Sequence, residues 1–279
     1  MKTQQHWLVA QFRQGFSAHN RERAVRDLRE GFRQVELWGL LGLHDIRQRY
    51  RRSKIGPFWI TLSMGIFIGA LGLVYGKLFG RALDSYLTYL AAGFLVWSFM
   101  SSTILDGTRV FLRSGGMIKQ LTAPLSVYLL RMVWENLIIF FHNIWIFIGL
   151  AIWFGIGFGW VTLLAVPGLL LLLINGLWVG LLLGVLSARF RDIPLMLQSS
   201  MQLIFFLTPI IWEPGMLPGR PLLLSGNPFY HFLELVRAPL LGQLPSLENL
   251  LVALAVTLVG WAVAFAFFVV YRWRIPYWV

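Results

Sequence analysis

The sequence contains no cysteine among its 279 residues. A disulfide, a thiol nucleophile and a thiolate metal site are therefore excluded, and the redox compartment is left open. Charge is also scarce, because Asp, Glu, Lys and Arg make up 13% of the chain, against about 25% in an ordinary soluble domain. Acidic residues are half as frequent as basic residues, with 12 against 24. They form no cluster that predicts a metal site.

The common enzyme signatures are missing as well. The stretch that comes nearest to a P-loop, Gly72 to Lys77, is one residue too short, so the chain cannot cradle ATP in that way. Neither H-E-x-x-H nor G-x-S-x-G occurs, and the five histidines are scattered. The chain before the first apolar run holds no apolar segment of the kind found in cleavable signal peptides. We therefore expect a protein without catalytic residues.

What the sequence has in abundance is apolar length. Hydrophobic residues make up 57% of the chain, and the mean hydropathy is +0.68. The apolar runs are continuous rather than alternating, which favours membrane-spanning helices over a β-barrel. We predict an all-α polytopic membrane protein with six transmembrane helices and an N-terminal amphipathic interface helix. The six spans are expected at 58–79, 86–105, 132–154, 161–187, 195–212 and 249–271.

The basic residues are distributed unevenly between the two sides of these spans. A cationic run from Asp45 to Lys54 ends directly before the first apolar run, which is typical of a cytoplasmic membrane boundary. With the N-terminus inside, all but four of the 24 basic residues fall on cytoplasmic segments. The four exceptions are Lys77, Arg81, Arg220 and Arg237. This asymmetry predicts that both termini are cytoplasmic and explains the net charge of +12 without nucleic acid.

Three regions are expected outside or between the spans. Residues 1–29 read as a cytoplasmic tail, 30–56 as an amphipathic interface helix with the cationic junction, and 57–275 as the six-span domain. In the first cytoplasmic loop, Gly115-Gly116 and Pro124 bracket a short helix, 117–121, that could dock a partner. The outer loop 213–248 contains a second amphipathic helix between Pro228 and Leu241, with Glu234 and Arg237 on its polar side.

Small and polar residues inside the spans leave alternatives open. Glycines recur at helical spacing in the first and fourth spans, which suits either packing within one subunit or a homodimer seam. These glycines are Gly65, Gly69, Gly72, Gly76 and Gly80, and Gly176, Gly180 and Gly184. Glu135 lies four residues after Arg131 and can form a local ion pair with it. Asn175 is expected to hydrogen-bond between helices. We find no chain of ionisable groups through the membrane, which argues against a proton-coupled carrier.

The fifth span carries a stripe of amide and aromatic side chains. Gln198, Gln202, Phe205 and Phe206 fall along one side of the predicted helix, and Trp212 follows. Aromatic faces stack on sugar rings and amides hydrogen-bond hydroxyl groups, so such a stripe suits a channel for a glycan. Helix packing and an aromatic belt at the membrane interface are the alternative explanation.

These features, in this order, resemble the permease subunit of type-2 ABC exporters of polysaccharides. This is the family that exports O-antigen, capsule and teichoic acid chains, and the first span is most similar to O-antigen-type members. The matching stretches lie at 37–59, 114–131, 187–194, 205–212 and 227–242. The resemblance implies a homodimer in the bacterial inner membrane, bound to two copies of an ABC ATPase. It also implies a polyprenyl-diphosphate-linked polysaccharide as substrate. ATP and magnesium would bind to the partner subunit, so that no cofactor is expected in this chain.

The resemblance also implies roles for particular residues. The contact with the ATPase would be made by Gly116, Met117, Ile118, Lys119, Gln120, Pro124, Arg189, Arg191 and Asp192. The substrate headgroup would meet Arg47, Arg49, Arg51, Arg52 and Lys54 at the cytoplasmic access to the channel. The channel would be lined by Phe58, Trp59, Gln198, Gln202, Phe205, Phe206 and Trp212. An outer gate would be formed by Phe229, Phe232, Leu233 and Val236.

Two other functions are weighed against polysaccharide export. The first is a type-2 ABC exporter of a small molecule or lipid, which the dependence of ATPase rate on substrate would distinguish. The second is a membrane glycosyltransferase or flippase-like enzyme acting on polyprenyl lipids. Such an enzyme needs paired acidic residues such as D-x-D at the inner face, and the sequence contains none.

Overall fold

The structure is a computed structural model that describes residues 16–49, 51, 56, 58–216 and 224–279. Within these ranges every regular element is a helix. The α-helices are α2 (Ala18–Arg33), α3 (Val35–Arg49), α4 (Phe58–Leu78), α5 (Leu83–Arg113), α6 (Gly115–Gln120), α7 (Leu125–Trp153), α8 (Ala165–Arg189), α9 (Ile193–Leu207), α11 (Pro228–Leu240), α12 (Leu247–Tyr271) and α13 (Ile275–Trp278). Three 3₁₀ turns, η1 (Trp160–Leu164), η2 (Pro214–Met216) and η3 (Arg272–Arg274), connect them.

Among the described residues, five helical segments are long and apolar enough to cross a membrane. They are Phe58–Leu78, Leu83–Gln120, Leu125–Trp153, Trp160–Arg189 and Leu247–Trp278. The prediction of an all-helical polytopic membrane protein is confirmed, with five of the six expected spans. The remaining one, expected at 195–212, is the shorter apolar helix α9.

Helix α9 is short because a proline stops it. It has 15 residues, which correspond to about 22 Å, whereas the hydrocarbon core of a bilayer is about 30 Å thick. Thr208 precedes Pro209 and adopts an extended conformation, as residues before proline commonly do. The chain then continues without regular structure to η2. The expected fifth span is therefore a helix followed by an irregular segment.

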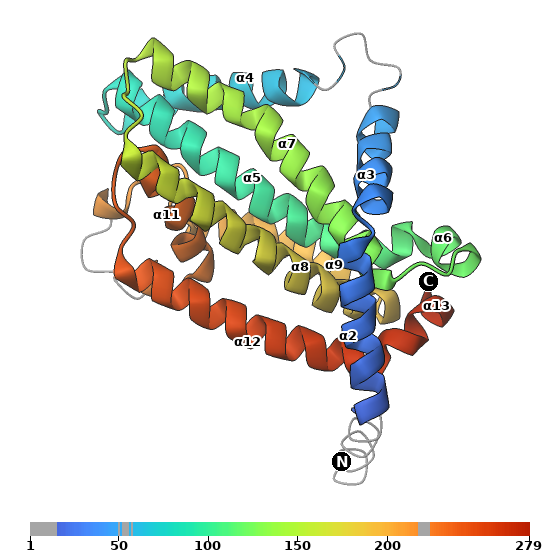
Figure 1. Cartoon of the computed structure of the whole chain (residues 1–279). Coiled ribbons are helices and arrows are strands. Elements are labelled where there is room, and N and C mark those ends of the chain that lie inside the picture. Colours follow the sequence, from blue (N-terminus) through green and yellow to red (C-terminus); the bar gives the residue numbers. More distant parts are fainter. Residues whose placement is uncertain (1–15, 50, 52–55, 57, 217–223) are drawn as a thin grey trace.

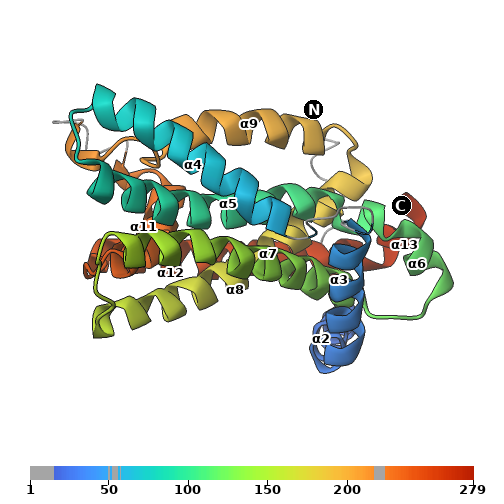
Figure 2. The same cartoon turned by 90° about the horizontal axis from the view of Figure 1, so that it is seen from above.

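The long helices run side by side, and α5 lies at the centre of the bundle (Figure 1). Helices α2 and α3 cross one end of the bundle, where α6 and α13 also lie, and α11 lies toward the other end. Figure 2 shows α4 and α9 along one side and α8 along the opposite side. In the most apolar stretch of the segment Leu83–Gln120, which contains α5, 67% of the residues are buried, whereas in that of α4 only 11% are buried. Helix α4 therefore exposes most of its surface.

The glycine stripe of α8 serves packing within the subunit. A side chain at Gly107 of α5 would meet the Cα of Gly180 at 2.9 Å, so the two backbones touch. A side chain at Gly184 would meet the Phe111 ring of α5 at the same distance of 2.9 Å. In α4, Gly72 and Gly76 pack on α5, but Gly69 faces open space. The packing interpretation is confirmed for α8 and for part of the α4 stripe.

The N-terminal region differs from the prediction. We expected a tail up to residue 29 and one interface helix over 30–50, but the structure has two helices, α2 and α3, separated by Gln34. Helix α2 begins early because Ser17 caps it, with the Ser17 hydroxyl accepting a hydrogen bond from the backbone N–H of Asn20 at 3.3 Å. The sequence did not predict its start at Ala18, because half of its residues are charged and its buried stripe contains no large apolar residue. The buried residues are Ala24, Asp27 and Gly31.

Two shorter helices were predicted closely. The loop helix expected at 117–121 is α6, which begins at Gly115 and ends at Gln120. The break falls at Ser114 rather than at the two glycines. The outer helix expected between Pro228 and Leu241 is α11. Its first residue is a proline, which suits the first turn of a helix, and Asn227 caps it.

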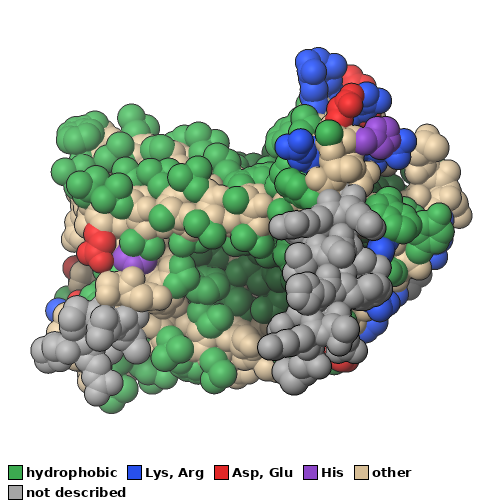
Figure 3. Space-filling view, turned by 90° about the horizontal axis from the view of Figure 1, so that it is seen from below, with side chains coloured by type: hydrophobic (Ala, Val, Ile, Leu, Met, Phe, Trp, Pro, Cys, Tyr) green, Lys and Arg blue, Asp and Glu red, His purple; other side chains and the backbone are tan. Residues whose placement is uncertain are grey.

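Charged side chains gather at the α6 end of the molecule (Figure 3). The rest of the face seen in Figure 3 is mainly apolar and is hollowed near its middle. Helices α2, α3, α5 and α8 each carry a basic residue in the last turn at this end: Arg33, Arg49, Arg113 and Arg189. The charged side chains are thus distributed unevenly along the bundle axis, with most of them at the α6 end on the face seen in Figure 3.

Candidate functional site

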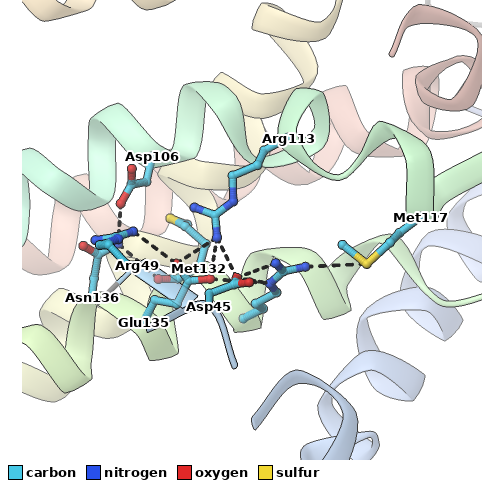
Figure 4. A network of polar contacts seen from close by, with 9 residues as sticks. Asp45, Arg49, Asp106, Arg113, Met117, Met132, Glu135 and Asn136 are labelled. Atoms are coloured by element: carbon cyan, nitrogen blue, oxygen red, sulfur yellow. Dashed lines mark hydrogen bonds and ion pairs between the residues drawn. The ribbon is translucent and has the colours of Figure 1, made fainter. Parts of the chain in front are cut away.

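An ionic cluster joins three helices at the α6 end (Figure 4). It consists of Asp45 and Arg49 from α3, Arg113 from α5, and Arg131 and Glu135 from α7. Arg113 donates to Asp45 Oδ2 at 2.6 Å and to Glu135 Oε1 at 2.7 Å. Arg131 pairs with Asp45, and its Nε lies 3.4 Å from Glu135 Oε1. Arg49 approaches Glu135 Oε2 at 3.7 Å. The expected local pair of Arg131 and Glu135 is therefore confirmed as one part of a larger cluster.

The environment of Asp45 favours its charged form. Burial opposes ionisation, but hydrogen bonds from Arg131 and Arg113, together with the positive charges of these two arginines, outweigh it. The pKa of Asp45 consequently lies below its ordinary value. Since both carboxylates of the cluster are paired with arginines, the arrangement suits the fixing of α3 on α5 and α7.

Nothing in the sequence indicated that Asp45 links helices. It appeared there only as a polar residue of the interface helix, beside the cationic run. The packing of α3 explains the placement, because Trp38 of α3 meets Trp134 of α7 edge to face with ring centroids 5.9 Å apart. Gly42 lies against the same Trp134 ring, where a larger residue would collide. This apolar contact brings the next turn of α3 to Arg131.

The two stretches expected to contact an ATPase are held together by α13. Gly115, at the start of α6, packs against Val279. Arg191 donates to the backbone carbonyl of Trp278 at 2.8 Å, and the Arg189 guanidinium lies 5.8 Å from a Trp278 ring centroid. The exposed members of this surface are Gly116, Lys119, Gln120, Arg189, Arg191 and Asp192, and the half-buried ones are Met117, Ile118 and Pro124. Their role in ATPase contact stays a prediction.

The residues expected to meet a substrate headgroup lie at the end of α3 and after it. Arg47, Arg49 and Arg51 are exposed. Of these three described side chains, Arg49 forms an ion pair, with its guanidinium 3.7 Å from Glu135 Oε2. Arg52 and Lys54 lie outside the described residues. The described part of this set therefore borders the ionic cluster and presents positive charge beside it.

The residues expected to line a channel are spread over α4, α9 and the segment after α9. Phe58 and Trp59 are exposed at the start of α4, and Gln198, Gln202 and Phe206 are exposed on α9. The other two are more enclosed. Phe205 packs on Phe94 and Trp97 of α5, each with ring centroids 5.6 Å away. Trp212 is half-buried, and its indole donates to the carbonyl of Phe206 at 3.1 Å. The structure thus places this set on α4, on α9 and, for Trp212, on the irregular segment after α9; both helices lie beside α5 (Figures 1 and 2).

The residues expected to form an outer gate pack into the bundle. Phe232, Leu233 and Val236 are buried, and Phe229 lies against Trp97 with centroids 5.9 Å apart. The expectation that Arg237 belongs to an exposed polar side of this helix is wrong, because only 1% of the residue is exposed. The reason is that α11 is covered by α5, α8 and α12. Whether these residues gate a channel stays a prediction.

Arg237 supports the irregular segment after α9. It donates to the carbonyl of Pro209 at 2.5 Å, pairs with Glu234, and lies 4.3 Å from the ring centroid of Tyr89. The Tyr89 hydroxyl donates to the carbonyls of Pro209 and Trp212, each at 3.0 Å. Irregular backbone at membrane depth needs such partners, since lipid offers none. A buried arginine here could have been suspected only from its spacing of three residues from Glu234.

Polar groups inside the spans make local and interhelical hydrogen bonds. Asn175 of α8 donates to the Thr257 hydroxyl of α12 at 2.8 Å, which confirms the expectation for that residue. Among the residues that the structure describes, no group of three or more His, Asp or Glu side chains is placed to hold a metal ion.

Comparison with known proteins agrees with this arrangement. Residues 36–241 match the ABC-2 type transporter family. Two relatives, each named O-antigen export system permease protein RfbA from Klebsiella pneumoniae, are 22% identical over 181 and 177 residues. Each alignment covers 63% of this chain and 68% of the relative. Permeases of this family are non-catalytic and work with a separate ATPase subunit. The matched region contains α3 to α11, including the ionic cluster and the Arg237 site, and the chain belongs to the ABC-2 type transporter family as a membrane permease subunit.

Proposed function

We propose that this permease exports a lipid-linked polysaccharide of the O-antigen type across the bacterial inner membrane. In this proposal two copies of the chain form a homodimer with two copies of the ATPase subunit, which binds ATP and magnesium. The distant similarity to O-antigen export permeases supports the substrate class. The charged α6 end would face the cytoplasm, as the positive-inside rule requires.

The observation that carries the proposal is the set of exposed side chains on α4 and α9, which both pack on α5. These two helices lie on one side of the bundle and flank α5 (Figure 2). Interspersed with exposed aliphatic side chains, they carry two exposed amides and four exposed aromatic rings, and neither helix contains an acidic residue. The amides and rings belong to Gln198, Gln202, Phe206, Phe58, Trp59 and Phe67. Aromatic rings and amides suit the two surfaces of a sugar, its C–H face and its hydroxyl groups. Two such surfaces facing each other would enclose a path along the membrane normal.

The α6 end would supply the contacts to the ATPase and to the lipid headgroup. In the proposal, α6 and the turn at 190–192 dock on the ATPase. Arg47 and Arg51 meet the diphosphate, for which the arginine guanidinium is well suited. Because the ionic cluster lies between these two groups of residues, movement of α6 would be transmitted to α3.

The test is deletion of this permease from its host, followed by location of the cell glycan. We expect lipid-linked polymer to accumulate inside cells with bare surfaces. Complementation with Phe206→Ala or Gln202→Ala should restore surface glycan only in part. Met196→Ala, which changes an exposed residue on another face of α9, should restore it fully. Normal surface glycan in the deletion strain, with no second exporter present, would overturn the proposal.

Export of a small apolar molecule or lipid is the second candidate. It is favoured by an apolar cavity of about 250 Å³ between α5, α8, α11 and α12. Phe99, Met100, Phe229 and Val256 are among its lining residues, and Asn175 is one of the few polar ones. This function predicts that apolar compounds, rather than a lipid-linked glycan, stimulate ATP hydrolysis by the purified complex.

A further inference from the structure

Helix α2 is an addition to the matched family region, which begins at residue 36. It lies across the α6 end of the bundle and contacts α7 and α12 (Figure 1). One stripe of the helix is buried there, whereas Arg26, Arg29 and Arg33 on the other side are exposed. A helix this polar would not be held by apolar contacts alone, so its polar contacts decide where it sits.

The central polar contact is made by Asp27, which is 5% exposed. Its carboxylate accepts hydrogen bonds from the backbone N–H of Leu125 at 3.2 Å and of Ser126 at 3.0 Å. It also accepts one from the Ser126 hydroxyl at 3.0 Å and pairs with Arg272 at 2.9 Å. Four donors from two separate parts of the chain therefore converge on one side chain.

Leu125 and Ser126 are the first residues of α7, whose first N–H groups have no partner within the helix. The residue in the capping position is Pro124, which offers no side-chain acceptor. Asp27 thus does from another helix what a Ser or Asp does from the capping position. Its negative charge is also favoured at the positive end of the α7 dipole.

A close backbone contact fixes the distance between α2 and α7. A side chain at Gly31 would come within 2.0 Å of the Ser126 hydroxyl oxygen. The same hydroxyl donates to the backbone carbonyl of Asp27 at 2.6 Å. Only glycine permits this approach, so α2 can dock in this place but not slide along α7.

The anchored residues lie directly after the segment that connects α6 to α7. This segment, 121–124, has no helical structure of its own. Thr122, Ala123 and Pro124 line a polar cavity of about 280 Å³ together with Arg23 and Arg272. The connection is therefore bounded on one side by α2 and fixed at its end by Asp27.

We propose that α2 is a strap that sets the position of α6 for the ATPase, and that Asp27 is its positioning residue. The inference rests on the proposed docking of the ATPase at α6. Without Asp27, the first turn of α7 loses its cap and the 121–124 connection gains freedom. The ATPase would then have to order α6 on binding, which weakens its affinity.

The test measures the dissociation constant of the purified ATPase subunit for the full-length permease in lipid nanodiscs. We expect Asp27→Ala to weaken binding about tenfold, which corresponds to about 1.4 kcal/mol. Asp27→Asn should have a smaller effect, because the amide oxygen still accepts a hydrogen bond. Gly31→Ala, which displaces α2 without touching the carboxylate, should weaken binding in the same direction. Arg29→Ala on the exposed side of α2 is the matched control and should bind like the wild type.

Thermal unfolding of the same samples separates positioning from simple stability. If Asp27→Ala lowers the unfolding temperature but the folded permease binds the ATPase with wild-type affinity, the strap proposal is overturned. Ile118→Glu in α6 tests the docking assignment itself and should abolish binding. If Ile118→Glu binds normally, the assignment of α6 is wrong and the strap inference falls with it. If Ile118→Glu fails to bind while Asp27→Ala binds normally, only the strap is refuted.

Discussion

The two ends of the bundle hold their paired arginines in different ways. At the α6 end, three arginines share two carboxylates, and Arg113 and Arg131 each touch both. At the other end, Arg237 stands with one carboxylate, one backbone carbonyl and one aromatic ring. A shared cluster can lose a member and keep its remaining charges paired. At a single site, the loss of one partner leaves the other charge unpaired. Replacing one charged residue should therefore lower stability more at Arg237 than in the ionic cluster.

The largest effect is expected at Arg237. Replacing it with Met removes the donor to the Pro209 carbonyl and leaves Glu234 without its partner. Removing one partner of a buried pair costs about 3–5 kcal/mol. We expect Arg237→Met to be poorly folded, with a strongly lowered unfolding temperature in detergent.

Arg237→Lys is the matched control for this site. It keeps the charge near Glu234 but loses the planar guanidinium that stacks on Tyr89 and donates to Pro209. Its unfolding temperature should fall between those of the wild type and Arg237→Met. An Arg237→Met protein as stable as the wild type would show that the irregular segment after α9 does not depend on this residue.

The ionic cluster should show a smaller loss for each substitution and strong coupling between them. After Glu135→Gln, both Arg113 and Arg131 keep Asp45 as a partner, and after Asp45→Asn both keep Glu135. The double variant leaves neither carboxylate. We therefore expect its loss of unfolding free energy to exceed the sum of the single losses by about 1–3 kcal/mol, measured in a double-mutant cycle. Strict additivity would mean that the two carboxylates act independently.

Acid provides a second measurement on the same cluster. The folded-state pKa of Asp45 is lowered from its ordinary value of 3.8, so its contribution to stability is complete above that value. The contribution is lost as pH falls through the folded-state pKa. The wild type should therefore lose more stability than Asp45→Asn when pH is lowered below about 4. Parallel pH profiles for the two proteins would contradict this assignment.

The comparison also shows what the sequence could and could not predict. Continuous apolar runs identified five spans, and the glycines at helical spacing in α8 identified a packing face. The stop in α9 was missed because the apolar run continues past Pro209, although the residue before a proline leaves the helical region.

The candidate site was predictable only where it is local in sequence. The pair of Arg131 and Glu135 follows from a spacing of four residues on one helix. Asp45 and Arg113 join them from helices far away in the chain, and no spacing encodes that meeting. Arg237 and Asp27 were misjudged for a related reason. Arg237 was placed on the polar side of an amphipathic helix and Asp27 in the N-terminal tail, whereas neighbouring helices bury both.

Tyr86 tests one hydrogen bond at the α11 end of the bundle. Its hydroxyl donates to the carbonyl of Ile211 at 2.7 Å, and removing it in Tyr86→Phe leaves that carbonyl without this donor. We expect a loss of about 1 kcal/mol of unfolding free energy, measured by thermal unfolding in detergent. Tyr277→Phe, at an exposed residue of α13, is the control and should not change stability.

The smallest effect is expected for the pair of Arg81 and Glu213, which joins the turn between α4 and α5 to the segment after α9 at 2.5 Å. The pair resembles the ionic cluster in geometry, but the Arg81 side chain is 44% exposed. Water then screens the charges, and exposed pairs are worth about 0.2–1 kcal/mol. Arg81→Ala should therefore lower stability by less than Tyr86→Phe does, and the difference from wild type should shrink further at high salt. A loss as large as that of Arg237→Met would show that the segment after α9 is held mainly from the α4–α5 turn. In that case burial would not be what makes Arg237 more costly to replace than Arg81.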